Sequence, residues 1–411
     1  MKKFSIIPVN NARGVKNFHR VASRLYKDDP NWVCPLFNDI EHIFSPQHNP
    51  LFSEGGGGEA IRWVLVDERG ELVGRIAAFY NREKASIECQ PTGGCGFFEC
   101  IDDFEAASCL FDAAKDWLKE RGMEAMDGSV NFGDRLMWWG VLVEGFYSPL
   151  YGMNYNLPYY GALFEAYGFG NYFNQHTYMR PFDPEIRFPE ALIAKAQRLY
   201  ENPDYTFTTF DKRNTPKMAR DFCEVYNKAW AKFEGVKPLS IEAAEKLIAS
   251  MKPIIDPEVL FFAYKGEQPI GFFVITPDIN PIIKDFNGKL NLINKLKLLY
   301  RLKTKKAERL SGLIFGVVPE YQSHGIEAAL IRMFEMYVEK RRESGTAIYD
   351  HLQMQWVGDF NPVMMRMCES YVRAVRYKRH ITYRYLFDRE KEFCRAPRLS
   401  PTPRAKKVEA K

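Results

Sequence analysis

The chain has 411 residues, which is enough for two or three domains that each bury a core. Hydrophobic residues make up 46% and charged residues 27%, a balance that excludes a disordered chain. The net charge of only +5 gives no overall nucleic-acid signature, and the eight scattered cysteines without a C-x-x-C pair indicate neither a disulfide framework nor a metal site.

The N-terminal region predicts a helix and a flexible connection. It has no apolar run of signal-peptide length, and no later segment approaches a membrane span, so we expect a cytoplasmic protein. Apolar residues between Val15 and Leu25 recur at helical spacing. The glycine run at 55–58 is followed by neither a lysine nor a helix, so we interpret it as flexible linkage rather than a phosphate loop.

An internal repeat organises the rest of the chain. Residues 63–81 are two apolar runs around a tight polar turn, which predicts a hairpin, and residues 259–278 repeat this pattern. A strand and a long helix follow each hairpin. The inward face of the first of these helices is predicted to consist of Ala107, Phe111, Ala114 and Leu118.

The second copy of this unit contains a loop that can hold an anion. Leu313 to Val318 is an uninterrupted apolar run, which predicts a strand buried on both faces, and a helix follows from about Ile326 to Gly345. Between them, Gly325 lets the backbone approach a ligand, and the first amides of the helix are unpaired. A strand, loop and helix with no ligand is the alternative interpretation.

Strand, then Q-x-x-G-x, then helix resembles the pyrophosphate loop of the GNAT superfamily of CoA-dependent N-acyltransferases. The residues that the resemblance implies for acyl-CoA binding in this loop are Gln322, Ser323, His324, Gly325, Ile326 and Ala328. Glu327 stands where that family has a small residue. The order of hairpin, strand, helix, strand, helix and strand occurs twice, so the resemblance implies an α/β (α+β) fold of two tandem GNAT-like domains. Each would have a central mixed twisted sheet flanked by helices.

The expected domains are residues 1–185, a connecting helix at 186–205, a second domain at 206–392, and a disordered basic tail at 393–411. In the first copy the loop has no glycine, and Asp102, Asp103 and Glu105 stand at the start of the helix, where they would repel a pyrophosphate. We therefore expect acyl-CoA in the second copy, and no metal. The first copy would be structural or would bind the acceptor.

The resemblance also implies a backbone amide that binds the thioester carbonyl, and the matching positions are Val317 and Val318. The family's usual acid is a tyrosine seven residues after the asparagine that begins the next helix. Here that asparagine is Asn361, which we include in the cofactor site, and the acid position is Cys368. Tyr371, one turn later, is the expected displaced acid.

A base must take the proton from the attacking amine. Our candidates are His351 and Asp359, because strand alternation places His351, Gln353 and Gln355 on one face of an interior strand and so indicates a wet cleft. A structural role for His351 and a helix-capping role for Asp359 are the alternatives.

Residues 287–309 are rich in lysine and arginine against the single acid Glu308. Leu292, Leu296 and Leu299 form an apolar stripe, flanked by Ile293 and Tyr300. This pattern predicts a basic amphipathic helix that lies on an anionic membrane surface. A helix packed on its own domain, with a solvated basic face, is the alternative.

Together these features favour an acyl-CoA-dependent N-acyltransferase. Aromatic residues at 15% and the basic helix favour a lipid-like amine, such as the sphingoid base used by the similar bacterial ceramide synthases, and a location on the inner face of the cytoplasmic membrane. Two other classes stay open. One is an aminoacyl-tRNA-dependent transferase of wall-peptide synthesis, and the other is a non-catalytic, membrane-peripheral protein that binds acyl-CoA or lipid.

Overall fold

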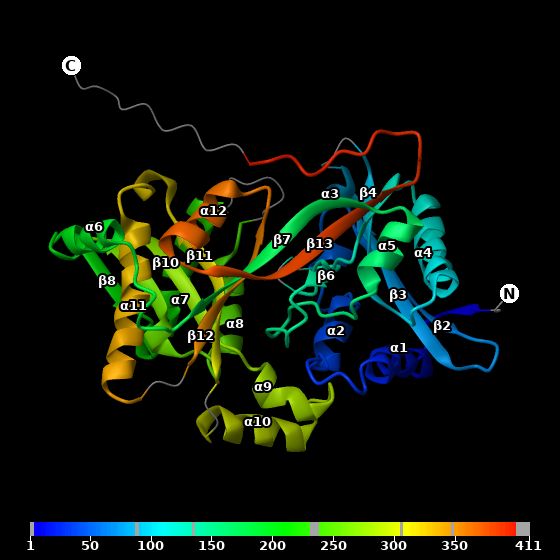
Figure 1. Ribbon diagram of the computed structural model, residues 1–411, viewed down its shortest axis with the longest axis horizontal. Helices are drawn as coiled ribbons and strands as arrows, with labels where there is room; N and C mark the ends of the chain where they lie inside the picture. The colour runs from blue at the N-terminus through cyan, green and yellow to red at the C-terminus, as the bar shows by residue number, and fades with distance from the viewer. Residues whose placement is uncertain are drawn as a thin grey trace.

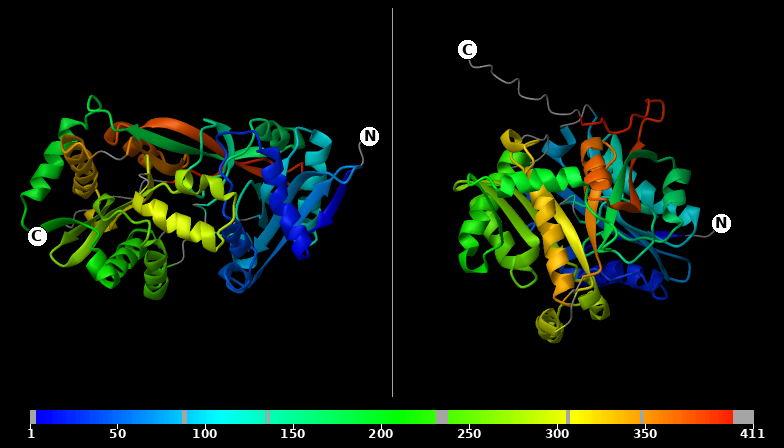
Figure 2. Two further views of the ribbon diagram at one scale, coloured as in Figure 1. Left: turned by 90° about the horizontal axis from the view of Figure 1, so that it is seen from below. Right: turned by 60° about the vertical axis from the view of Figure 1, so that its left-hand side comes forward.

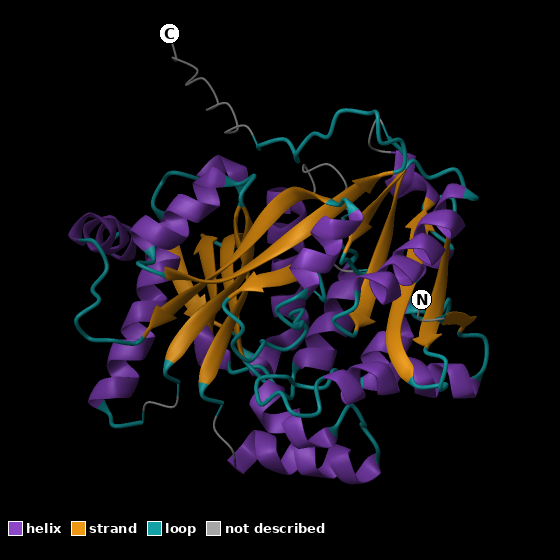
Figure 3. Ribbon diagram, turned by 45° about the vertical axis from the view of Figure 1, so that its right-hand side comes forward, coloured by secondary structure: helices purple, strands orange, loops and turns teal. Residues whose placement is uncertain are grey.

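One continuous sheet runs through the whole molecule in the computed structural model, and helices cover its two faces (Figure 1, Figure 3). The structure describes residues 4–399 apart from 87–89, 134, 136, 231–237, 305–306 and 347–348. Within this part of the chain the sheet has 13 strands in the order β1-β2-β3-β4-β5-β13-β7-β12-β11-β10-β9-β8, and β6 pairs with β13. The predicted fold class, tandem mixed α/β units, is confirmed.

The helices and strands of the first half are β1 (Ser5–Pro8), α1 (Ala12–Leu25), α2 (Phe37–Ile43), β2 (Gly58–Val66), β3 (Leu72–Asn81), α3 (Arg82–Ser86), β4 (Thr92–Cys100), α4 (Phe104–Lys119), β5 (Ala125–Gly128), β6 (Val141–Glu144), α5 (Tyr160–Tyr167) and β7 (Gly170–Pro181). Those of the second half are α6 (Glu190–Tyr200), β8 (Tyr205–Thr209), α7 (Thr215–Trp230), α8 (Ile241–Met251), β9 (Leu260–Lys265), β10 (Gln268–Pro277), α9 (Asn280–Ile283), α10 (Leu292–Thr304), β11 (Arg309–Val317), α11 (Ile326–Glu343), β12 (His351–Gly358), α12 (Pro362–Arg366) and β13 (Val375–Leu386). Short 3-10 turns occur at η1 (Pro50–Phe52), η2 (Lys212–Asn214), η3 (Pro257–Val259), η4 (Lys284–Phe286) and η5 (Pro319–Tyr321), and a π turn at η6 (Met367–Tyr371).

Local sequence patterns account for most of these elements. The predicted hairpins at 63–81 and 259–278 are the pairs β2–β3 and β9–β10. The predicted inward face of α4 is fully buried at all four positions, and Asp103 caps this helix by accepting a hydrogen bond from the Ala106 amide. The connecting helix appears as α6, between Pro189 and Glu201.

The last strand of each half pairs with strands of the other half. β7 lies between β12 and β13, with Tyr178 opposite Met354, and β13 lies between β7 and β5, with Tyr383 opposite Gly128. In Figure 1 these two long strands cross the middle of the molecule side by side. The backbone hydrogen bonds of the sheet therefore continue from one half to the other.

The cysteines and the other side chains that could bind a metal ion lie as follows. Cys95 and Cys100 are buried free thiols, whereas Cys89 lies outside the described residues. In the described ranges no group of three or more His, Cys, Asp or Glu side chains is arranged to hold a metal ion.

Candidate active site

β11 and β12 start as a parallel pair and then separate. The paired residues run from Arg309 opposite His351 to Gly312 opposite Met354, and beyond them no pairing continues. We call the opening between residues 313–317 of β11 and 355–358 of β12 the β11–β12 gap. At its start, β11 has one extra residue against β10, a bulge of the kind that bends a strand.

The gap exposes apolar side chains in the interior of the sheet. Leu313, Ile314 and Phe315 are partly exposed, although the residues on both sides of them along β11 are buried. The prediction of a strand buried on both faces was therefore wrong for these three residues. The physical reason is that β12 turns away and leaves one edge of β11 uncovered, and apolar groups at such an edge can bind an extended apolar ligand.

Two backbone amides of β11 point into the gap. The Val318 amide donates to the Ile270 carbonyl at 2.9 Å, so it faces β10 and is already paired. Ladder hydrogen bonds alternate along an antiparallel strand, so the Val317 and Phe315 amides face the other way, toward the gap. Of the two predicted carbonyl-binding positions, Val317 is therefore the available one, and Phe315 joins it.

The matching opening of the first half is filled by its own side chains. The Cys100 amide, at the end of β4, donates to the Tyr160 hydroxyl at 3.1 Å, and the Tyr159 hydroxyl donates to the Cys100 carbonyl at 2.7 Å. Phe98, Glu99 and Cys100 are all buried. Tyrosines of α5 thus occupy in the first half the place that is open in the second.

The loop before α11 has the geometry of an anion site. Gly325 adopts a left-handed conformation with φ of 98°, and a Cβ there would lie 3.3 Å from Leu199 of α6, so a side chain at this position is strained. The first intrahelical bond runs from the Ala329 amide to the Gly325 carbonyl. The amides of residues 326–328 are therefore the ones that a helix leaves unpaired at its positive end.

Glu327 places its own carboxylate at this loop. Its Oε1 accepts a hydrogen bond from the Ser323 amide at 3.3 Å, and burial raises the pKa of this carboxyl. The Gln322 side chain donates to the Val317 carbonyl at 3.0 Å and ties the loop to the end of β11, while His324 is exposed. An anionic ligand at this loop must therefore displace or neutralise Glu327.

A row of polar side chains crosses the central strands on the face opposite α11. We call it the polar row, and its members are Gln175, Thr177, Ser311, His351, Gln353, Gln355, Lys378, His380 and Thr382. Within the described residues, buried polar atoms of Gln175, Ser311, Gln353 and Gln355 have no hydrogen-bond partner. Each such atom costs about 1–3 kcal/mol, which indicates a surface built for a polar ligand or water rather than for stability.

A small cavity of about 10 Å³ lies where the polar row meets the first half, and it has room for about one water molecule. Its lining residues are Trp138, Trp139, Met153, Asn154, Gln355, Trp356 and His380. Nε2 of His380 lies 2.9 Å from the Asn154 carbonyl. A carbonyl only accepts, so Nε2 carries the hydrogen and Nδ1 keeps a lone pair.

His380 is a candidate base that our sequence analysis missed. Burial lowers the pKa of His380 to about 4, against the smaller effect of its bond to Asn154, so the ring is neutral at physiological pH. The available signal was the alternation of Lys378, His380 and Thr382 in the last strand, which our sequence analysis did not use.

The two predicted bases lie at opposite ends of β12 and are not brought together. His351 is paired with Arg309 of β11. Arg309 precedes Val317 by eight residues, so His351 and Val317 are separated by roughly 26 Å along the strand direction. The His351 ring lies within 2.9 Å of the Gln353 amide group, and burial and the charge of Arg309 lower the pKa of His351. At that distance it cannot take a proton from an amine that attacks a carbonyl held at Val317.

Asp359 lies beyond the other end of β12, where other groups already bind it. Its carboxylate accepts hydrogen bonds from the Asn174 side chain at 2.7 Å and from Arg395 at 2.6 Å. Although burial opposes it, these bonds lower the pKa of Asp359. The cap of α12 is instead Asn361, whose side chain accepts from the Met364 amide at 3.2 Å.

The predicted acid positions have opposite environments. Cys368 is fully buried, with its sulfur 3.9 Å from that of Met354. Tyr371 ends the π turn after α12 and is 46% exposed, so its side chain lies at the surface. Neither group is presented to the gap by the contacts that the structure records.

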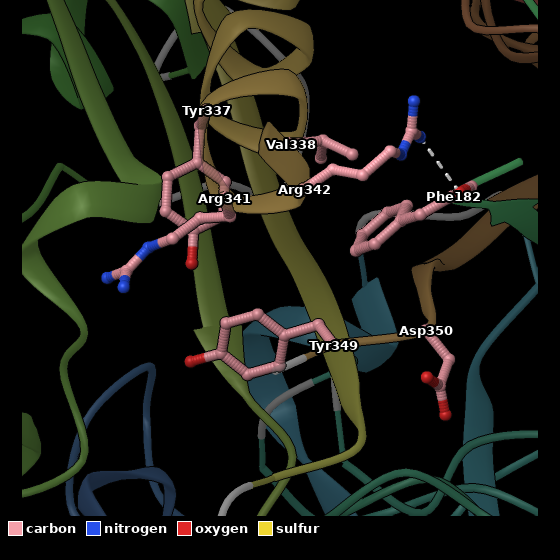
Figure 4. A pocket seen from close by; sticks show the side chains of 7 residues that line it. All are labelled: Phe182, Tyr337, Val338, Arg341, Arg342, Tyr349 and Asp350. Atoms are coloured by element: carbon pink, nitrogen blue, oxygen red, sulfur yellow. Dashed lines mark hydrogen bonds between the residues drawn. The ribbon is translucent and has the colours of Figure 1, made fainter. Parts of the chain in front are cut away.

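A cavity of about 250 Å³ lies at the other end of α11 (Figure 4). Its lining residues are Phe182, Tyr337, Val338, Arg341, Arg342, Tyr349 and Asp350. Arg341 pairs with Glu258, and Arg342 donates to the Phe182 carbonyl at 3.0 Å. This cavity is separated by the length of α11 from the anion loop, so it is not part of the candidate site.

The chain is similar over most of its length to two known proteins. No protein-family model matches it. It is 27% identical over 385 residues to the bacterial ceramide synthase of Caulobacter vibrioides, covering 92% of this chain and 96% of the relative. It is 28% identical over 385 residues to protein YghO of Escherichia coli, covering 91% and 93%.

Two solved structures share the fold. A tandem GNAT protein from the clavulanic acid biosynthesis pathway superposes with a TM-score of 0.52 at 10% identity, over 94% of this chain and 99% of that one. The GCN5-related glucosamine N-acetyltransferase region of a fungal multi-domain β-N-acetylglucosaminidase gives 0.52 at 11% identity, over 94% of this chain and 38% of that longer chain. At this identity they establish the fold alone, which is the tandem GNAT arrangement.

Proposed function

We propose that this protein, a tandem GNAT-fold N-acyltransferase similar to a bacterial ceramide synthase, transfers the acyl group of an acyl-CoA to the amine of a lipid-like acceptor such as a sphingoid base. The observation that carries the proposal is the β11–β12 gap beside the anion loop, at the end of β11. The gap offers two free amides and an apolar edge, and the loop offers unpaired amides for phosphates.

The donor would lie along β11. Its pyrophosphate would meet the amides of residues 326–328, its pantetheine arm would follow the uncovered edge at Leu313 and Phe315, and its thioester carbonyl would accept from Phe315 or Val317. These amides are fixed by the sheet, so they stabilise the oxyanion formed on amine attack without reorganising. The filled counterpart in the first half supports a single donor site.

The acceptor amine would approach across the polar row. His380, neutral and with Nδ1 unprotonated, lies on β13, three strands from β11 in the sheet, so it would take the proton that the amine loses through bridging water, and Gln355 would orient the amine. The relative named bacterial ceramide synthase, similar over nearly the full length of both chains, supports a sphingoid base as acceptor.

The direct test is incubation of the purified protein with a long-chain acyl-CoA and sphinganine, with mass spectrometry of the N-acyl product and of released CoA. Equal release of CoA with and without the amine would contradict acyl transfer. Transfer to an amino sugar or a peptide amine but not to sphinganine would overturn the lipid acceptor and keep the acyltransferase.

We expect Glu327→Gln to bind CoA roughly 3- to 10-fold more tightly than the native protein, because a carboxylate no longer competes for the helix start. Glutamine keeps an oxygen for the Ser323 amide, so the loop should not change. The native carboxyl has a raised pKa, and it loses its charge as the pH falls through that value. Calorimetry over a series of pH values should therefore show the affinity advantage of the variant shrinking as the pH falls, and a constant advantage would refute this role.

We expect His380→Ala to lower kcat about tenfold, a modest loss because a base of pKa about 4 is far below the working pH. His351→Ala is the matched control, and its kcat should stay within about threefold of the native value, because His351 lies far from the gap. Protonation of the acceptor amine lowers the rate of every variant on acidification, so His380 is reported by the ratio of the native rate to the His380→Ala rate. This ratio should fall only as the pH approaches 4, where His380 gains a proton. A native-to-variant rate ratio that falls on acidification for His351→Ala, and not for His380→Ala, would reverse the two assignments.

A further inference from the structure

α10 presents its apolar side chains to solvent instead of to the core. Leu292, Ile293, Leu296, Leu299 and Tyr300 are between 53% and 72% exposed. We call these five residues the α10 stripe. The helix stands at the lower edge of the molecule in Figure 1, and the view from below in Figure 2 shows it near the middle of that side, between the two halves. These five side chains therefore do not pack on their own domain.

The opposite side of α10 holds the helix in place. Leu298 and Leu302 pack on an apolar cluster that contains Leu36, Ile282 and Phe286. Arg301 donates to both oxygens of Asp285 and, at 2.7 Å, to the Ile282 carbonyl. The helix is thus anchored without the stripe, and Arg301 is not among the side chains available to a partner.

Within the described residues, the exposed charged side chains of α10 itself are all positive. At 3.6 residues per turn, Lys295 and Lys297 lie on the two sides of the stripe and Lys303 lies at its C-terminal end, and all three are exposed. The sequence has no acidic residue from 287 to 304, and Lys305 and Lys306 lie outside the described residues. Arg309, expected to belong to this basic surface, is instead buried at the start of β11.

We propose that the α10 stripe and its flanking lysines bind the surface of an anionic lipid bilayer. The five apolar side chains would enter the boundary between headgroups and acyl chains, while the lysine stems extend along the stripe and place their ammonium groups at lipid phosphates. A second copy of the chain fits less well, because two such faces would bring lysines together with no acid to pair them.

The binding would be peripheral. Within the part of the chain that the structure describes, no helix is long and apolar enough to cross a bilayer. The docking itself does not depend on the proposed acyl transfer. α10 precedes β11 and the anion loop follows it, so they lie near the two ends of this strand, roughly 30 Å apart. This placement suits the proposed acyl transfer. A lipid amine would then enter from the membrane end while CoA stays at the aqueous end.

The test is sedimentation of the full chain with vesicles of phosphatidylcholine and phosphatidylglycerol, and with vesicles of phosphatidylcholine alone. The native protein should bind the anionic vesicles, and less at 0.5 M salt. Lys295→Glu, Lys297→Glu and Lys303→Glu together should weaken binding on the order of 100-fold. A separate variant, Leu292→Ser, Leu296→Ser and Leu299→Ser, should lose binding without changing the charge.

The matched control replaces three exposed lysines outside α10 by glutamate, at Lys16, Lys119 and Lys252. This variant should bind the vesicles as well as the native protein does. Thermal unfolding of every variant should match that of the native protein, because all six altered α10 side chains are exposed. The proposal fails if the native protein ignores anionic vesicles at low salt, or if the control weakens binding equally. It also fails if light scattering shows a dimer that only the serine variant dissociates. Loss of vesicle binding with intact acyl transfer to soluble short-chain amines would separate this proposal from the proposed function.

Discussion

Val317→Pro should lower acyl transfer by about 10²- to 10³-fold, the loss that follows removal of one donor from an oxyanion site. Proline has no amide hydrogen, and its ring would enter the β11–β12 gap where that hydrogen points. The Val317 amide faces away from β10, so no ladder hydrogen bond of the sheet is removed with it. Steady-state kinetics with acyl-CoA and an amine acceptor would measure the effect, and thermal unfolding would confirm the fold.

Val317→Ala is the control, because it trims the side chain and keeps the amide. Its activity should stay within about threefold of the native value, which corresponds to roughly 0.65 kcal/mol. If the alanine and proline variants lose activity equally, the side chain and not the amide is the important group. If neither loses activity, the donor does not lie along β11.

Asp278→Ala should lower the free energy of unfolding by about 3–5 kcal/mol, because it leaves a buried guanidinium without its counter-charge. The Asp278 side chain is completely buried and accepts from Arg309 Nε at 2.7 Å and from the Tyr151 amide at 2.9 Å. Arg309 also donates to the Pro149 carbonyl at 2.7 Å. The pair therefore joins the second half to the first-half segment beside the polar row, and chemical denaturation would measure its loss.

Asp285→Ala is the control, because it removes the carboxylate that pairs with Arg301 in an ion pair at the surface. The Asp285 side chain is 55% exposed in its pair with Arg301, so the loss should be about 1 kcal/mol or less. Combining Asp278→Ala with Arg309→Met should recover part of the stability lost by the first change alone, because no buried charge then remains unpaired. Equal losses for Asp278→Ala and Asp285→Ala would contradict the role given to burial.

Only part of the candidate site followed from the sequence. Gly325 and the start of α11 were found because a buried strand, a glycine and a helix start are local signals that lie close together in the chain. The direction of the Val318 amide depends on which residue of β10 it faces, and the chain carries no local sign of that register. The sequence showed Glu327 in place of a small residue, but not that its carboxylate accepts a hydrogen bond from the Ser323 amide.

The sequence by itself determined the elements, their order and their repetition, because hydrophobic periodicity, caps and turn residues act over a few residues. It placed both hairpins, the face of α4 and the polar face of β12 correctly. Only the tertiary structure decided that β7 and β13, the last strands of the two halves, each pair with a strand of the other half. It also decided that His380, and not His351, lines a cavity with residues of the first half, and that the α10 stripe is exposed to solvent. Strand pairing and the choice of which helix face is covered depend on contacts between distant segments, and strands of similar composition pair equally well in several orders.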